Sequence, residues 1–106
     1  MDANQILQDN FDKKNNSFLY LLYEKSLFKK EEFRRLCDAI RVVAEDNVNI
    51  SRNAQKISFI YGQTLKCFLY HFDKNDKYKI ENLPENYNKM IEFLDKSVEY
   101  YFTTRI

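Results

Sequence analysis

The chain has 106 residues, of which only one is glycine and one is proline, and its 17 basic and 16 acidic side chains nearly balance. Average usage would place roughly seven glycines and five prolines in such a chain. The dinucleotide fingerprint, the P-loop and the nucleophile elbow each need two or more neighbouring glycines, so these sites are excluded. Small β-sandwiches and barrels depend on glycine-rich turns, which leaves an all-α fold, an irregular four- to five-helix bundle forming a single domain over residues 1–106.

Helical spacing of apolar residues predicts the elements in chain order. Ser17 is placed as the N-cap of a short helix with almost no polar face. Further along, Phe33, Leu36 and Ile40 recur at spacings of three and four, with charged side chains between them, which predicts an amphipathic helix. Pro84 stands where the first turn of the last helix tolerates it. The predicted helices cover about residues 3–15, 17–28, 30–46, 52–72 and 84–103, and the polar segment 73–82 is predicted to be the longest loop.

The segment 52–72 is apolar in almost every direction. Its main buried face is predicted to consist of Ala54, Ile57, Tyr61, Leu65, Phe68, Leu69 and Phe72. Five further residues lie away from that face, namely Phe59, Ile60, Cys67, Tyr70 and His71. Either this is the central helix of the bundle, which we favour, or it exposes aromatic residues to a partner or to a second copy of the chain. Gly62 in its middle indicates a close helix crossing.

Cys67 and His71 stand four residues apart on one helix face, and Cys37 could add a third ligand. Such sets occur in zinc sites and in Cys-His nucleophile pairs. Here there is no fourth ligand, and Cys37 lies within an apolar stripe, where cysteine behaves as a small hydrophobic residue. We therefore expect two free thiols, no metal, no cofactor and no enzymatic activity. An enzyme that uses His71 with Cys67 is kept as a competing hypothesis, ranked below the two binding functions described below. The loop from Asp73 lacks the glycine and the final glutamate of a calcium-binding loop.

Two charged surfaces are candidates for binding. The basic segment 25–41 contains Lys25, Lys29, Lys30, Arg34, Arg35 and Arg41. Glu31 and Glu32 lie at helical spacing from Arg34 and Arg35, so an ordinary solvated face of mixed charge is the competing interpretation of this segment.

The last helix presents the opposite charge. Its Glu85, Glu92 and Glu99 repeat every seven residues, with Asp95 beside them. Phe93 and Tyr100 fall on the border between this acidic ridge and the buried face. Aromatic anchors beside carboxylates favour a basic protein partner, whereas the competing interpretation is a solvated helix whose border aromatics fold onto their neighbours.

These observations favour a protein that acts by binding. We expect a small cytoplasmic inhibitor, most simply a bacterial immunity protein that neutralises a basic, nuclease-type toxin through Glu85, Glu92, Phe93, Asp95, Glu99 and Tyr100. This expectation rests on size and class. The alternative is a regulatory or phage-type adaptor that binds nucleic acid through the basic segment 25–41, although the balanced charge makes nucleic acid the less favoured partner. No stretch long and apolar enough for a membrane span is evident, so no membrane partner is expected, and self-association into a homodimer is left open.

Overall fold

The computed structural model of this protein describes residues 2–46 and 49–104 and confirms the all-α prediction. Five helices form, and this described part of the chain contains no strand. Each helix lies where apolar spacing predicts one, although most ends differ by a few residues. The helices are α1 (Ala3–Asp12), α2 (Phe18–Lys25), α3 (Lys30–Ala44), α4 (Ile50–Phe72) and α5 (Tyr87–Thr104).

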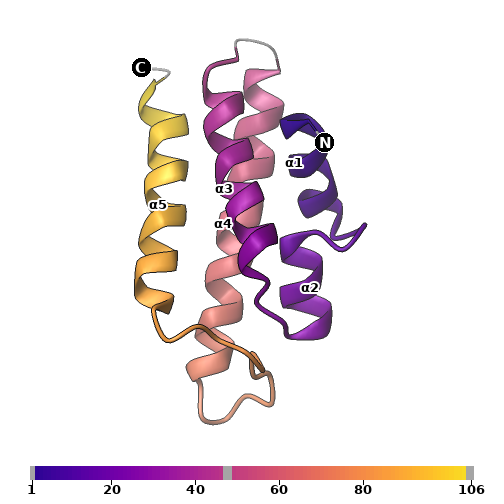
Figure 1. Cartoon of the computed structure of the whole chain (residues 1–106), viewed down its shortest axis with the longest axis vertical. Helices are drawn as coiled ribbons and strands as arrows, with labels where there is room; N and C mark the ends of the chain where they lie inside the picture. Colours follow the sequence, from indigo (N-terminus) through magenta and orange to yellow (C-terminus); the bar gives the residue numbers. More distant parts are fainter. Residues whose placement is uncertain (1, 47–48, 105–106) are drawn as a thin grey trace.

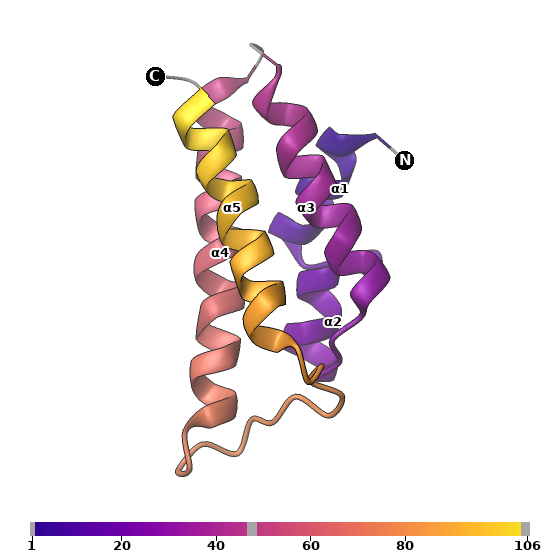
Figure 2. The same cartoon turned by 60° about the vertical axis from the view of Figure 1, so that its left-hand side comes forward.

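The helices are arranged as four neighbouring columns (Figures 1 and 2). The two short helices, α1 and α2, follow one another and together form one column. The other three columns are α3, α4 and α5, with α3 packed against α1 and α5, and α4 packed against α1, α2 and α5. Because α4 runs in the opposite direction to both α3 and α5, the last helix is parallel to α3 and antiparallel to α4 (Figure 2).

Aromatic side chains hold the centre of the bundle together. The ring centroids of Phe18, Phe28 and Phe33 lie 5.2 Å from one another, and Phe28 also lies 6.2 Å from Phe68 of α4. Such tilted and edge-on pairs add to the stabilisation that comes from burial. The predicted buried face of α3 is confirmed, because Phe33, Leu36, Cys37, Ile40, Val43 and Ala44 are all buried.

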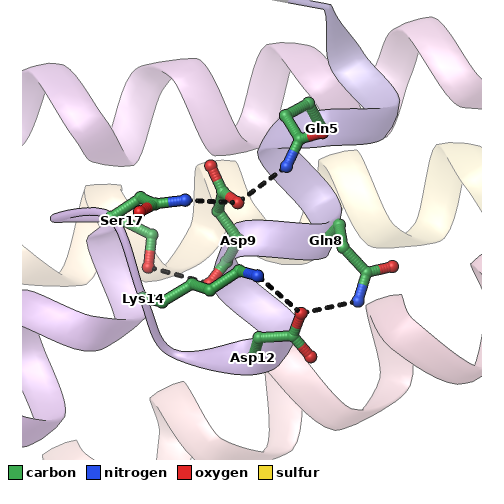
Figure 3. Close-up of polar contacts among 7 residues, drawn as sticks. Gln5, Gln8, Asp9, Asp12, Lys14 and Ser17 are labelled. Carbon is green, nitrogen blue, oxygen red and sulfur yellow. Dashed lines mark hydrogen bonds and ion pairs between the residues drawn. The ribbon is translucent and has the colours of Figure 1, made fainter.

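The turn between α1 and α2 is held by polar contacts (Figure 3). The buried Asp9 accepts hydrogen bonds from Gln5 at 2.8 Å and Asn15 at 3.1 Å, and its carbonyl accepts one from Ser17 at 3.2 Å. Ser17 also caps α2 as predicted, since its hydroxyl accepts the backbone N–H of Tyr20.

Residues in the left-handed backbone conformation end the first two helices earlier than predicted. The φ angles of Lys13, Asn15 and Asn16 are 53°, 56° and 56°, so α1 ends at Asp12 rather than near residue 15. Ser26, with φ 57°, ends α2 at Lys25 rather than at residue 28. Non-glycine residues adopt this conformation at a steric cost, which explains why residue pattern alone did not locate the ends.

The predicted buried face of α4 is confirmed at Ile57 and Phe68 but wrong at Leu69 and Phe72, because the true face is rotated about the helix axis. The buried residues are Asn53, Ile57, Ile60, Thr64, Cys67 and Phe68. Leu69 and Phe72, predicted to be inside, are 69% and 53% exposed, whereas Ile60 and Cys67, predicted to lie away from the core, are buried. Phe59 and Tyr70 are exposed. The contacts of α4 with α1 and α2 select the buried face, and these contacts are not encoded in the spacing of α4 itself.

The predicted close crossing at Gly62 is also wrong within this chain. A Cβ atom added at Gly62 would meet no atom within 4 Å, and its φ is not positive. Glycine in a helix interior costs roughly 1 kcal/mol relative to alanine. Nothing in the packing of the single chain therefore requires glycine here.

The loop that follows α4 is tied to the rest of the bundle. Ile80 is buried in the core, and the side chain of Asn82 both accepts from the Phe28 N–H at 2.7 Å and donates to the Phe28 carbonyl at 2.9 Å. Pro84 does not start α5, which begins three residues later at Tyr87, and its carbonyl instead accepts the Tyr87 N–H at 3.2 Å.

Removing the Asn82 side chain should loosen this loop. Asn82→Ala leaves the N–H and the carbonyl of Phe28 without their partner, and we expect the free energy of unfolding to fall by about 1–2 kcal/mol. Urea denaturation measures this change. The matched control is Asn75→Ala in the same loop, since the exposed Asn75 takes part only through its backbone N–H. Equal effects of the two substitutions would contradict the anchoring role of Asn82.

Candidate functional site

The acidic and aromatic residues predicted as a binding surface spread over different sides of α5. Phe93 and Tyr100 lie toward α3, where both rings contact Arg41. Asp95 lies toward α4 and accepts a hydrogen bond from Tyr61 at 2.5 Å. Five of the six predicted residues, Glu85, Glu92, Phe93, Asp95 and Glu99, are exposed, with Glu85 in the turn before the helix, and Tyr100 is half-buried. The structure therefore leaves Glu92 and Glu99 on the outer face of α5 and separates Phe93 and Tyr100 from Asp95.

Arg41 connects α3 to α5. Its guanidinium carbon lies 5.5 Å from the ring centroid of Phe93 and 5.6 Å from that of Tyr100. Its Nε donates to the hydroxyl of Ser97 at 3.1 Å. A cation held against two aromatic faces is favourable and pre-organised. Thus Arg41, predicted as part of the basic segment, lies on the same surface as Phe93 and Tyr100, which were predicted as part of the acidic surface.

The polar border groups of α5 are also engaged with neighbouring helices. The Tyr100 hydroxyl donates to the carboxylate of Glu45, and this hydrogen bond raises the pKa of Tyr100. The hydrogen bond to Asp95 is likewise the main cause that raises the pKa of Tyr61 to about 12. On the outer face, Glu92 pairs with Lys96 at 3.3 Å. Exposed pairs of this kind contribute little to stability.

The basic segment 25–41 does not form one continuous cationic patch. Arg35 pairs with Glu31 at 3.0 Å and with Glu32 at 3.3 Å, and Arg41 is held by α5. The remaining four cations, Lys25, Lys29, Lys30 and Arg34, are exposed.

A hollow lies between α3 and α5 at the edge of the aromatic core. We call it the α3–α5 groove, and its volume is about 540 Å³. The rings of Phe33 and Phe93, with centroids 6.5 Å apart, give it an apolar base. Its lining is Lys30, Phe33, Arg34, Asp38, Met90 and Phe93.

The sequence patterns did not reveal this groove, because its residues come from two helices 50 or more positions apart. Phe93 was assigned to an acidic surface and Lys30 and Arg34 to a basic one. Two sequence features bear on the groove. Phe93 lies at the border of the buried face of its helix, and polar residues of α3 stand between its apolar ones. Only the parallel packing of α3 against α5 places these residues on one hollow.

His71 is hydrogen-bonded to the loop after α4, and both cysteines are buried. The Nδ1 atom of His71 accepts the backbone N–H of Ile80 at 2.8 Å and thereby fixes the start of the loop. Cys37 and Cys67 are buried free thiols, and burial raises the pKa of both, that of Cys37 to about 12. Within residues 2–46 and 49–104, no cluster of three or more His, Cys, Asp or Glu side chains is arranged to hold a metal ion.

No helix within residues 2–46 and 49–104 combines the length and the apolar composition needed to cross a bilayer.

The hydrogen bond at His71 predicts a pH dependence of stability. Burial, and secondarily the charge of Lys79, lowers the pKa of His71 below its ordinary 6.5. The unfolded chain therefore takes up a proton before the native protein does, so stability is complete above about pH 6.5 and decreases as the pH falls toward the lowered native pKa. The urea midpoint should decrease as the pH is lowered from about 7.5 to 5.5. Ordinary carboxylates titrate below this pH range.

The variant His71→Asn provides the control for this prediction. Its Oδ1 atom can occupy the position of Nδ1 and accept the Ile80 N–H, but the side chain does not titrate. Since His71 is the only histidine, the urea midpoint of the variant should be flat over the same pH range. A variant that loses stability as steeply as the wild type would contradict the assignment to His71.

The chain was compared with protein-family models, with curated proteins and with solved structures. None of these comparisons finds a match. The arrangement of the chain's own residues is therefore the basis for its proposed function.

Proposed function

We propose that this protein acts by binding another protein, with the α3–α5 groove as the anchoring point. The observation that supports this proposal is Phe93, which is 39% exposed at the groove although its ring already rests on Phe33 and Arg41. Aromatic residues, phenylalanine among them, are enriched at protein interfaces, where a few central side chains seated in pockets carry most of the binding energy. The contacts of Phe93 keep its ring in place before a partner arrives, which lowers the entropy cost of binding.

Charged residues near the groove would orient an approaching protein partner by electrostatic attraction. Lys30 and Arg34 stand on the α3 side with Asp38 between them in sequence, whereas Glu92 and Glu99 point outward from α5. A surface with separated positive and negative regions steers a partner of matching pattern and rejects others. A partner with a basic surface would meet the outer face of α5 while inserting an apolar side chain into the groove.

The biological role we propose is inhibition of a protein toxin, in the manner of an immunity protein that blocks a nuclease-type toxin by direct contact. Supporting features are the small helical bundle, the held aromatic residue at a hollow and the exposed carboxylates of α5. The parallel with immunity proteins is one of size and class. Binding of nucleic acid through the basic segment 25–41 is less favoured, because Arg35 and Arg41 are engaged with groups of the chain itself.

Two phenylalanines of α5 allow a matched test. Phe93 and Phe102 are 39% and 40% exposed on the same helix, but only Phe93 lines the groove. The proposal predicts that a toxin domain is encoded beside this chain's gene, and its absence would contradict the inhibitory role. Each variant is co-expressed with that domain, and growth and the dissociation constant of the complex are measured. We expect Phe93→Ala to weaken binding by at least about tenfold and to abolish protection, as loss of an interface anchor does. Phe102→Ala should protect like the wild type.

Urea denaturation of both variants shows whether each is folded at the temperature of the growth assay. Protection by a folded Phe93→Ala variant would contradict the groove as the anchoring point. A neighbouring toxin that the wild-type protein neither binds nor inhibits would contradict the proposed inhibitory role.

A further inference from the structure

The outer side of α4 carries a line of small and apolar residues that are exposed or half-buried, and at its end Phe72 touches Tyr87 of α5. We call it the α4 stripe. Its spacings of four, three, four and three residues are those of a coiled-coil seam. Among the large apolar residues of segments 2–46 and 49–104, Leu69 is the most exposed, at 69%, and Phe72 is 53% exposed. The stripe consists of Ser58, Gly62, Leu65, Leu69 and Phe72.

The buried line of α4 is mainly apolar, with Ile57, Ile60, Cys67 and Phe68, but part of it departs from what an isolated chain would favour. Its buried line includes the polar Asn53 and Thr64, and among the described residues the Nδ2 atom of the buried Asn53 has no hydrogen-bond partner. An unpaired buried amide costs roughly 1–3 kcal/mol. The helix thus keeps polar groups inside and leaves leucine and phenylalanine outside, which is expected where the outer line is covered by something else.

Gly62 indicates that the covering element is another helix. The open space around Gly62 means that the single chain does not need glycine at this position. A second helix crossing at Gly62 and the neighbouring Ser58 would need small side chains, because such residues let two helix backbones approach closely. The upper part of the stripe therefore fits a close helix contact, and its lower part fits leucine packing.

Charges flank the stripe with opposite signs. On the side away from α5 stands the exposed Lys66, and α4 has no acidic residue at all along its 23 positions. On the other side α5 presents the carboxylates Glu92, Asp95 and Glu99, of which Glu92 pairs with Lys96 and Asp95 accepts a hydrogen bond from Tyr61. A partner that complements this surface would carry an apolar helix face with a cationic flank on one side and an anionic flank on the other. A second copy of this chain has such a surface.

The heights of these charges along the bundle can be compared through two contacts. Phe72 lies against Tyr87, with ring centroids 5.3 Å apart, and Tyr61 reaches Asp95. Lys66 stands nearly midway between residues 61 and 72 of α4. Because the two helices are antiparallel, the corresponding height on α5 is that of Ile91 and Glu92 (Figure 2).

We infer that two copies of this chain associate through the α4 stripe, with their α4 helices parallel about a twofold axis. In this arrangement the Lys66 flank of each copy faces the carboxylate side of the other at the height of Glu92. An antiparallel pair would instead bring the two Lys66 flanks together. The twofold contact is self-complementary, as the commonest homodimers are, and it leaves the α3–α5 groove outside the interface.

Sedimentation equilibrium of the full chain, over about 1–300 µM, measures this association. We expect the wild-type mass to rise from 12.9 kDa to twice that value. Gly62→Leu should stay monomeric at all these concentrations, because a large side chain blocks the crossing. The single chain has space for leucine, which is also the better helix former, so the variant remains folded. Phe93→Ala should dimerise like the wild type.

A charge exchange tests the relative direction of the helices. Lys66→Glu and Glu92→Lys should each raise the dimer dissociation constant by at least about threefold at low salt, because each places like charges on facing flanks. The double variant should return toward the wild-type value. A double variant with the summed loss of both single ones would overturn the parallel arrangement.

A wild-type chain that remains at 12.9 kDa up to the highest concentration, or a Gly62→Leu variant that dimerises normally, would overturn the dimer. These outcomes are separate from those of the toxin test. Gly62→Leu alters the dimer without touching the groove, whereas Phe93→Ala alters the groove without touching the α4 stripe.

Discussion

The face of α4 that is buried determines most of the remaining structure. This helix contacts α1, α2 and α5, and it packs against α2 more extensively than α3 does. Its buried line meets the aromatic centre through Phe68, which lies near Phe28. Once that line is fixed, α5 lies beside α4 with Asp95 at Tyr61, and the loop between them is held at His71 and Asn82. The exposed surfaces of the molecule follow from the same rotation of α4.

The sequence predicts the helices that have strongly separated faces. In α3, charged residues such as Arg34, Arg35 and Asp38 alternate with the apolar ones, so only one orientation buries the apolar side. In α5 the buried Leu94, Val98 and Tyr101 likewise recur at spacings of three and four, with charged residues between them. α4 is apolar in several directions, so its own pattern allows more than one orientation, and contacts with helices distant in sequence decide between them.

The candidate surfaces were predictable only in part. The outward position of Glu92 and Glu99 follows from helical spacing, and the structure places both on the outer face of α5. The contact of Arg41 with Phe93 and Tyr100 depends on the parallel packing of α3 and α5, which no local pattern encodes. For the same reason the α3–α5 groove combines residues from surfaces that the sequence assigned to different functions. The helix ends were missed where residues such as Lys13 and Ser26 adopt positive φ.

Two properties of the α4 stripe carry the most weight: that it points outward and that a second copy of the chain covers it. Hydroxyl-radical labelling read by mass spectrometry at low and at high protein concentration tests both at once. We expect rapid oxidation of Leu69 and Phe72 in dilute protein and their protection in concentrated protein, with Ile60 protected and Phe93 oxidised in both. Protection of Leu69 in dilute protein would contradict the orientation of α4, and oxidation that is independent of concentration would contradict the association.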